Sequence, residues 1–110
     1  MQAQSLETID PAIRRLQKEL AALGPMRPGT LSRQYRDPQR RRGAYYQLSY
    51  TYRMKSKTEY VRAIERAQVR AETAIFRRFK KLTARWVDLA LQRSRLGRIR
   101  VRQKPSGGES

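Results

Sequence analysis

The sequence has no cysteine and no histidine among its 110 residues. Without cysteine the chain forms no disulfide and no thiolate metal site. Histidine is the most common metal ligand and the most common general base in proteins. We therefore expect neither a metal site nor a cofactor.

Enzyme motifs and long apolar runs are also missing. There is no glycine-rich phosphate loop and no nucleophile motif, and the few carboxylates are scattered. We therefore expect no catalytic residues and a non-enzymatic role. No apolar run approaches the roughly 20 residues of a membrane span, so we expect no membrane partner. Met1 to Asp10 are neither basic nor apolar enough for a secretory signal. A cytoplasmic protein is expected.

The chain does have a large excess of positive charge. It carries 26 Lys and Arg against 9 Asp and Glu, a formal net charge of +17. Solubility requires only about 2 to 8 units in a small domain. The excess is uneven, because residues 1–32 hold four basic and three acidic side chains, whereas residues 33–104 hold 22 and five. A polyanion such as nucleic acid is the expected partner.

The N-terminal region predicts a helix over Pro11–Leu23, preceded by a flexible segment over residues 1–10. Asp10 suits the N-cap and Pro11 the first helical position, and Gly24 and Pro25 end the helix. Its apolar residues follow helical spacing, and they are Ile13, Leu16, Leu20 and Leu23.

A basic loop and a β-hairpin are predicted next. Arg33 to Gly43 have no apolar pattern and should form an exposed loop. From Ala44 to Tyr52 the pattern has period two, which predicts a strand. Its inward residues are Tyr46, Leu48, Tyr50 and Tyr52, and its outward residues are Tyr45, Gln47, Ser49 and Thr51. Lys57 to Val61 could pair with it, and such a hairpin must pack on a helix to be stable.

A long helix is predicted over Ala63–Leu96, with Gly97 as its end. An apolar seam with heptad spacing runs along it, made of Ile75, Phe79, Leu82, Trp86 and Leu89 and widened by Phe76, Val87 and Leu91. This coiled-coil pattern should pack on the first helix or on a second copy of the chain, which allows a homodimer or a larger complex. Residues 98–110 should be a basic, disordered tail. The class is therefore α+β, with one small domain over residues 11–97.

Candidate nucleic-acid contacts follow from this layout. Arginine suits phosphate because its planar fork donates two hydrogen bonds at once, and an exposed tyrosine can stack on an unpaired base. The alternative for Tyr45 is that it merely covers the hairpin, and the alternative for the helix is a solvated basic face. The candidates are Arg33, Arg36, Arg40, Arg41, Arg42, Tyr45, Lys55, Lys57, Arg77, Arg78, Lys80, Lys81, Arg85, Arg98, Arg100 and Arg102.

Two sequence blocks also carry a family resemblance. Residues 23–32 read Leu-Gly-Pro-Met-Arg-Pro-Gly-Thr-Leu-Ser, residues 43–50 read Gly-Ala-Tyr-Tyr-Gln-Leu-Ser-Tyr, and Tyr60-Val61 and Phe76-Arg77-Arg78-Phe79 follow. Over residues 10–92 the chain resembles a family of short bacterial and archaeal proteins catalogued only as a domain of unknown function. The resemblance implies a helix, a turn, a loop, a strand and a C-terminal helix. Because members often lie near mobile elements, it also implies work on DNA or RNA by association. The family's loop cysteines are replaced here by Tyr35 to Arg42, so no metal site is implied.

We therefore expect an accessory protein that binds nucleic acid, as a subunit of a nucleoprotein complex or mobile-element system. The mixture of arginine and tyrosine, without a recognisable helix-turn-helix, favours RNA or single-stranded DNA over duplex DNA. The alternative is an adaptor or inhibitor that docks on an acidic protein surface.

Overall fold

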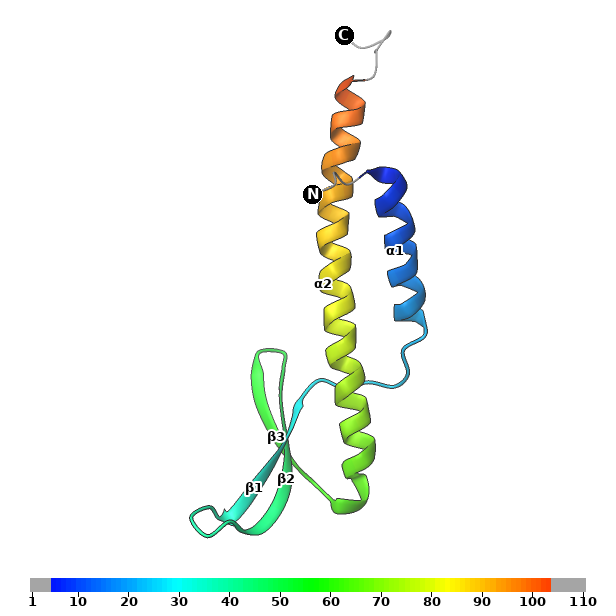
Figure 1. Ribbon diagram of the computed structural model, residues 1–110. Coiled ribbons are helices and arrows are strands. Elements are labelled where there is room, and N and C mark those ends of the chain that lie inside the picture. The colour runs from blue at the N-terminus through cyan, green and yellow to red at the C-terminus, as the bar shows by residue number, and fades with distance from the viewer. Residues whose placement is uncertain (1–4, 104–110) are drawn as a thin grey trace. The chain divides into compact units, whose positions relative to one another are not determined.

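The computed structural model describes residues 5–103 and shows two helices and a three-stranded sheet (Figure 1). The elements are α1 (Leu6–Ala21), β1 (Thr30–Asp37), β2 (Arg42–Tyr52), β3 (Lys55–Val61), a 3-10 turn (Ala63–Glu65) and α2 (Arg66–Gln103). The predicted α+β class is confirmed, as are the N-terminal helix, the hairpin and the long C-terminal helix.

The chain divides into two compact units, where the sequence suggested one domain over residues 11–97. The helical unit comprises the chain up to Ala22 and from Lys80 onward, and the sheet unit comprises Leu23–Phe79. Helix α2 contributes its first turns to the sheet unit and the remainder to the helical unit.

Helix α1 begins earlier than predicted. Ser5 is its N-cap, and the carbonyl oxygen of Ser5 accepts hydrogen bonds from the backbone N–H groups of Thr8 and Ile9 at 3.0 and 2.8 Å. Pro11 therefore lies inside the helix and Asp10 is not a cap. The extra turn buries Ile9, which is 0% exposed, and this burial explains why the helix extends beyond the local capping signal. Residues 6–10 are thus helical and not flexible, and residues 1–4 lie outside the described part.

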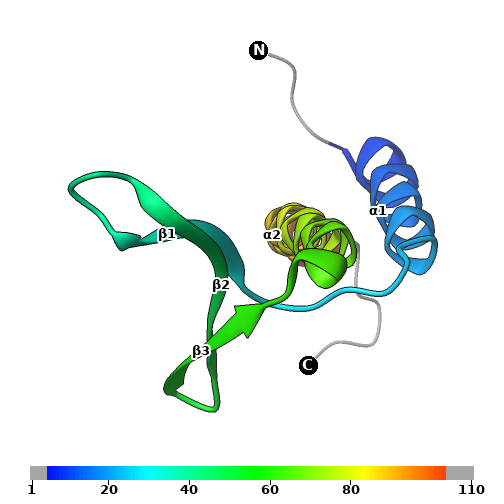
Figure 2. The ribbon, with the colours of Figure 1, turned by 90° about the horizontal axis from the view of Figure 1, so that it is seen from below.

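The helical unit pairs α1 with the second part of α2 in antiparallel fashion, as Figures 1 and 2 show. Arg93 Nε donates a hydrogen bond to Asp10 Oδ1 at 2.6 Å, and Arg100 Nη2 donates one to Glu7 Oε1 at 3.4 Å. Between the helices lie the buried side chains, which are Ile9, Ile13, Leu16, Leu82 and Leu89. Each buried Leu or Ile contributes roughly 1.5–3 kcal/mol by leaving water.

The predicted seam is only partly buried. Leu82 and Leu89 are buried within one chain, whereas Ile75, Phe79 and Trp86 are half-buried. Val87 and Leu91 do not widen the seam, because they are 58% and 53% exposed. Packing within the chain accounts for the two buried leucines, and pairing with a second copy stays a prediction.

Gly97 does not end α2, which continues to Gln103. A glycine inside a helix costs about 1 kcal/mol relative to alanine, and the ion pair between Arg100 and Glu7 lies beyond that glycine. The predicted disordered tail is therefore wrong for residues 98–103, and residues 104–110 lie outside the described part.

The predicted basic loop over Arg33 to Gly43 is instead divided among the end of β1, a short turn and the start of β2. Strand β1 was not predicted. This strand pairs antiparallel with β2, with Leu31 opposite Leu48 and Asp37 opposite Arg42. Only residues 38–41 form the turn between the two strands. The loop prediction failed because pairing with β2 satisfies the backbone of a strand that has few apolar side chains of its own.

Strand β2 also pairs with β3, so the sheet has the order β1–β2–β3. Tyr46 lies opposite Val61 and Tyr52 lies opposite Lys55. The two-residue connection is Arg53-Met54, and both residues have positive φ angles, 51° and 65°. That conformation is the one that matches the twist of a tight hairpin, and asparagine and glycine adopt it most readily.

One face of the sheet, which we call the inner face, contains the core of the sheet unit. Leu48 and Val61 are 1% and 5% exposed, and Thr73 of α2 is 1% exposed. The guanidinium carbon of Arg66 lies 3.8 Å from the centre of the Tyr46 ring, which places the first turns of α2 against β2 (Figure 2). The expectation that the hairpin packs on a helix agrees with this arrangement.

Candidate nucleic-acid interface

The register divides the sheet residues between two faces. Opposite residues share a face and successive residues alternate, so Leu48 and its partners Leu31 and Glu59 belong to the inner face. The outer face consists of Thr30, Ser32, Gln34, Arg36, Gly43, Tyr45, Gln47, Ser49, Thr51, Ser56, Thr58 and Tyr60. Within residues 30–61 the two carboxylates, Asp37 and Glu59, fall on the inner side of this alternation. The outer face therefore offers hydroxyls, amides, aromatic rings and one arginine, with no negative charge.

An aromatic cluster lies on this outer face. The ring centres of Tyr45 and Tyr60 are 6.5 Å apart with an interplanar angle of 40°, and the Arg36 guanidinium lies 5.8 Å from the Tyr45 ring centre. These distances are within the range of aromatic pairs and cation–π contacts. Tyr45 is half-buried, but Tyr60 is 64% exposed. One ring of the pair thus faces solvent and the other supports it.

Gly43 makes room for the arginine of this cluster. It lies across from Arg36 with φ of 71°, and a Cβ at this position would lie only 3.0 Å from the Arg36 Cβ and 3.3 Å from its Cδ. A side chain would be strained by the positive φ and would displace the arginine stem. Glycine therefore allows the Arg36 side chain to pass over position 43 of β2 and approach the Tyr45 ring.

Side-chain amides flank the two tyrosines. Gln34 lies directly opposite Tyr45, and Gln47 lies directly opposite Tyr60. Gln34 Nε2 donates a hydrogen bond to Ser32 Oγ at 3.1 Å, which orients this amide along the strand. An amide carries both donors and an acceptor, so these residues can recognise the edge of a base.

Three predicted arginines lie at the β1–β2 turn, which we call the arginine turn (Arg40, Arg41 and Arg42). The backbone N–H of Arg40 donates to Asp37 Oδ1 at 3.3 Å, a common arrangement in turns. Arg41 adopts a φ of 52°, and all three arginines are exposed. Arg36 lies on the strand that leads into this turn, so the positive charge adjoins the aromatic cluster at one end of the sheet.

Other predicted residues of the sheet lie elsewhere. Arg33 is opposite Tyr46 on the inner face, where its guanidinium lies 5.3 Å from the Tyr35 ring. Lys55 and Lys57 also belong to the inner face, toward the opposite end of the sheet. The structure therefore brings Arg36, Arg40 and Arg41 to the end of the sheet that holds Tyr45, whereas Arg42, opposite Asp37, falls on the inner side of the alternation. Arg33, Lys55 and Lys57 are also separated from the outer face.

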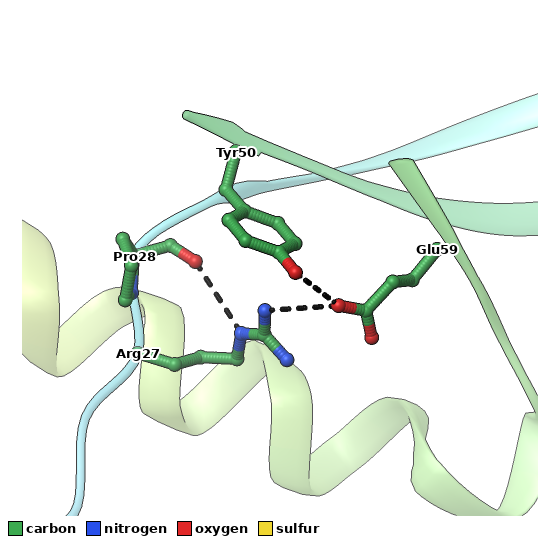
Figure 3. A network of polar contacts seen from close by, with 4 residues as sticks. All are labelled: Arg27, Pro28, Tyr50 and Glu59. Atoms are coloured by element: carbon green, nitrogen blue, oxygen red, sulfur yellow. Dashed lines mark hydrogen bonds and ion pairs between the residues drawn. The ribbon is translucent and has the colours of Figure 1, made fainter. Parts of the chain in front are cut away.

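The inner face has its own polar network, shown in Figure 3. The Tyr50 hydroxyl donates to Glu59 Oε2 at 2.6 Å, and Arg27 Nη2 lies 3.5 Å from the same oxygen. The hydrogen bond from Tyr50, followed by the charge of Arg27, holds the pKa of Glu59 below its ordinary value. The same hydrogen bond raises the pKa of Tyr50. Since Arg27 N also bonds to the Glu72 carbonyl of α2, this network ties the sheet to the helix.

Tyr52 was expected to point inward and pack, but it is 52% exposed. It lies next to the Arg53-Met54 turn, where its ring contacts the guanidinium of Arg53 at 5.2 Å. The inner face is covered only around Leu48 and Val61, so the end of the hairpin extends beyond the core. The register places all three tyrosines on the inner face as predicted. The packing prediction agrees with the half-buried Tyr46 and Tyr50 and is wrong for Tyr52.

The predicted basic residues of α2 are exposed. They are Arg77, Arg78, Lys80, Lys81 and Arg85, followed by Arg98, Arg100 and Arg102 near the helix end. Arg100 is held by Glu7 in the helical unit, and this pairing partly neutralises it. Arg77 and Arg78 belong to the sheet unit and the others to the helical unit. Among the described residues, α2 has no aromatic ring as exposed as Tyr60.

Two important residues of the outer face, Tyr60 and Gln34, were not predicted. Tyr60 precedes the buried Val61 on a short strand, so period-two alternation alone places it outward. Gln34 was assigned to a loop, where no face can be defined. The signal for Tyr60 was therefore present in the sequence, whereas the position of Gln34 required the pairing of β1.

Comparison with known proteins gave no match to any family model, curated protein or solved structure. The resemblance to a domain of unknown function therefore stays a prediction. Within residues 5–103, no helix is long and apolar enough to cross a membrane. The same residues contain no group of three or more Asp or Glu side chains placed to hold a metal ion.

Proposed function

We propose that this protein binds nucleic acid through the outer face of its sheet and the adjoining arginine turn. The observation that carries the proposal is the composition of that face, which combines polar and aromatic side chains with arginines at one end. The carboxylate nearest these arginines, Asp37, is paired with Arg40 in the turn, with Arg40 Nε 4.0 Å from Asp37 Oδ2. Phosphates supply most of the affinity in such complexes, and the bases are contacted by side chains on the same surface.

The role is that of an accessory protein and not of an enzyme. Positive charge on the turn and on α2 attracts a polyanion over a range of about 10 Å at ordinary ionic strength. The outer face then provides shorter-range contacts. A place in a nucleoprotein complex or mobile-element system, in a bacterial or archaeal cytoplasm, is part of this proposal.

A salt titration of binding tests the electrostatic part. If about six phosphates are contacted, affinity should fall roughly a thousandfold between 50 and 200 mM salt. Replacing Arg40, Arg41 and Arg42 by Gln should lower the slope of log affinity against log salt by about two to three units. Because all three side chains are exposed, each change should alter stability by less than about 0.5 kcal/mol.

A matched control separates position from total charge. Replacing Arg53, Lys55 and Lys57 by Gln removes the same three charges from exposed sites at the opposite end of the sheet. This variant should keep most of the affinity. Equal losses in the two variants would contradict the proposed interface and point to unspecific attraction.

The competing role, docking on an acidic protein surface, predicts a different result. Polyglutamate would then compete with nucleic acid at equal charge, because only charge would be recognised. Under the proposed function, nucleic acid should bind much more tightly than polyglutamate at 200 mM salt. A flat salt response or full competition by polyglutamate would overturn the proposal.

A further inference from the structure

Tyr60 is an aromatic side chain that the fold does not need for its core. It is 64% exposed on β3, and the neighbouring Val61 provides the buried contact of that strand. Its ring is nevertheless positioned, because Tyr45 lies beside it with ring centres 6.5 Å apart. Tyr45 in turn contacts the Arg36 guanidinium at 5.8 Å. An exposed ring that is held by its neighbours from one side is a ready platform for a flat ligand.

We propose that the outer face binds a single-stranded nucleic acid by stacking an unpaired base on Tyr60, with Tyr45 supporting that ring and Arg36 placed to contact the adjoining phosphate. This inference rests on the proposed function and assigns the expected preference for a single strand to one aromatic side chain. The sequence suggested Tyr45 as the stacking residue, and this inference assigns that role to the more exposed Tyr60 instead.

Stacking on Tyr60 requires a base whose flat face is free. In a duplex each base is stacked on its neighbours, so a tyrosine on a sheet reaches only the base edges and the backbone. In a single strand the bases separate and stack on aromatic side chains, and several sheet proteins bind RNA in this way. The exposed ring therefore selects a single strand over a duplex.

The surroundings of Tyr60 suit the rest of a nucleotide. The amide of Gln47 lies directly opposite Tyr60 and can reach the edge of a base stacked there. Arg36 and the arginine turn lie on the Tyr45 side of the cluster, where successive phosphates would follow. The strand register places no carboxylate of residues 30–61 on this face, and Asp37 beside the turn is paired with Arg40.

Alanine substitution tests the platform against a matched control. Tyr60→Ala should weaken binding of short oligothymidine or oligouridine about 5- to 150-fold, the range measured for one stacked base. Binding to a duplex of the same length should hardly change. Tyr60→Phe should restore single-strand affinity, since it keeps the ring. The control is Tyr52→Ala, which removes a similarly exposed ring, 52% exposed, from the inner face and should leave both affinities unchanged.

An abasic oligomer provides an independent measurement on the wild-type protein. It keeps the phosphates but has no base to stack, so it should bind more weakly than oligothymidine. For this oligomer, Tyr60→Ala and the wild type should bind equally. Comparing RNA and DNA strands of the same sequence shows which sugar is preferred, and either preference is compatible with stacking.

A fluorescent variant measures stacking directly and guards against misfolding of the alanine variant. In the double variant Tyr60→Trp and Trp86→Phe the only indole lies on the outer face, and adding oligothymidine should quench its emission strongly. The abasic oligomer should not quench it.

The results separate this inference from the proposed function. If Tyr60→Ala binds single strands as tightly as the wild type, or if the indole is not quenched, stacking is overturned while salt-dependent binding still stands. If the wild type binds neither single strands nor duplex, the proposed function itself fails. Tighter binding to duplex than to single strands would overturn only the preference for a single strand, and the proposed function would still stand.

Discussion

Replacing Gly29 by alanine should strongly destabilise the sheet unit. Gly29 has a φ of 138°, and a Cβ at this position would lie 2.6 Å from Leu48 Cδ1 and 3.2 Å from the Ser49 carbonyl oxygen. Leu48 is 1% exposed and lies in the middle of the central strand, so it has little room to move. The substitution therefore adds backbone strain to overpacking.

The two costs can be estimated separately. A residue with a side chain in such a backbone conformation costs about 1–3 kcal/mol, and overpacking a core by one methyl group costs about 1–3 kcal/mol. Together they amount to about 2–6 kcal/mol. Since a small domain has a total stability of about 5–15 kcal/mol, this change should remove a large part of it.

Gly97→Ala is the matched control, because the same chemical change should have the opposite sign there. Gly97 lies inside α2, and nothing lies within 4 Å of a Cβ built on it. Alanine at this position should stabilise the helix by about 0.5–1 kcal/mol.

Thermal unfolding followed by circular dichroism provides the measurement, because 1 kcal/mol shifts Tm by about 4–8 °C in a domain of this size. Trp86, the single tryptophan of the chain, reports on the helical unit in parallel. Unchanged melting of Gly29→Ala would refute the packing of Leu48 described above. A lower Tm for Gly97→Ala would refute a helix that continues past residue 97.

Two further substitutions make predictions for the inner face and for the helical unit. Tyr50→Phe removes the hydrogen bond that lowers the pKa of Glu59 and raises the pKa of Tyr50. The Glu59 contribution to stability is present above the ordinary carboxyl pKa and is lost as pH falls through the lowered value. The Tyr50 contribution is present below the ordinary phenol pKa and is lost as pH rises through the raised value. Tm of the variant should therefore fall less steeply than that of the wild type at both ends of the pH range, and parallel curves would contradict the role of this hydrogen bond. Trp86→Ala should cost about 2 kcal/mol, less than the roughly 3–5 kcal/mol of a fully buried tryptophan, because Trp86 is half-buried. Its emission in the wild type should lie between those of buried and water-exposed indoles, and a fully exposed spectrum would contradict packing against α1.

The apolar pattern predicted those helices and strands that have buried apolar side chains of their own. Leu16, Leu82 and Leu89 follow helical spacing and are buried, and the alternation around Leu48 marks β2. Strand β1 was not predicted because its stability comes from pairing with β2 and because its arginine-rich composition is typical of a loop. Pairing of this kind is a property of two segments, which a pattern within one segment does not record.

Helix ends were predicted less well than the helices, since capping residues compete with packing. Asp10 and Pro11 form a plausible helix start, yet Ile9 is fully buried one residue earlier and extends the helix. Gly97 is a plausible stop, but its cost of about 1 kcal/mol does not end α2, which continues through it to Gln103. At the first helix the local capping preference was outweighed by burial of Ile9.

The sequence predicted the chemical type of the candidate interface, but it predicted only part of its location. Arginine density correctly singled out the region around Arg36 and the turn as exposed and basic. It could not show that Arg33 belongs to the other face, because that depends on strand register. Tyr45 and Tyr60 are 15 positions apart in the sequence, and only the pairing of β2 with β3 makes them neighbours.

The tight turn at Arg53 and Met54 has a consequence for the order in which the sheet comes apart. Positive φ angles of 51° and 65° are unfavourable for both side chains, and Met54 is 97% exposed, so packing does not compensate for the strain at that residue. Strain of this kind is released as soon as the neighbouring pair of strand residues separates. We therefore expect the β2–β3 hairpin to open from its tip, and the pairing between Tyr46 and Val61 at its other end to be lost last. Backbone amides near residues 52–55 should exchange with solvent by local opening, long before the unit as a whole unfolds.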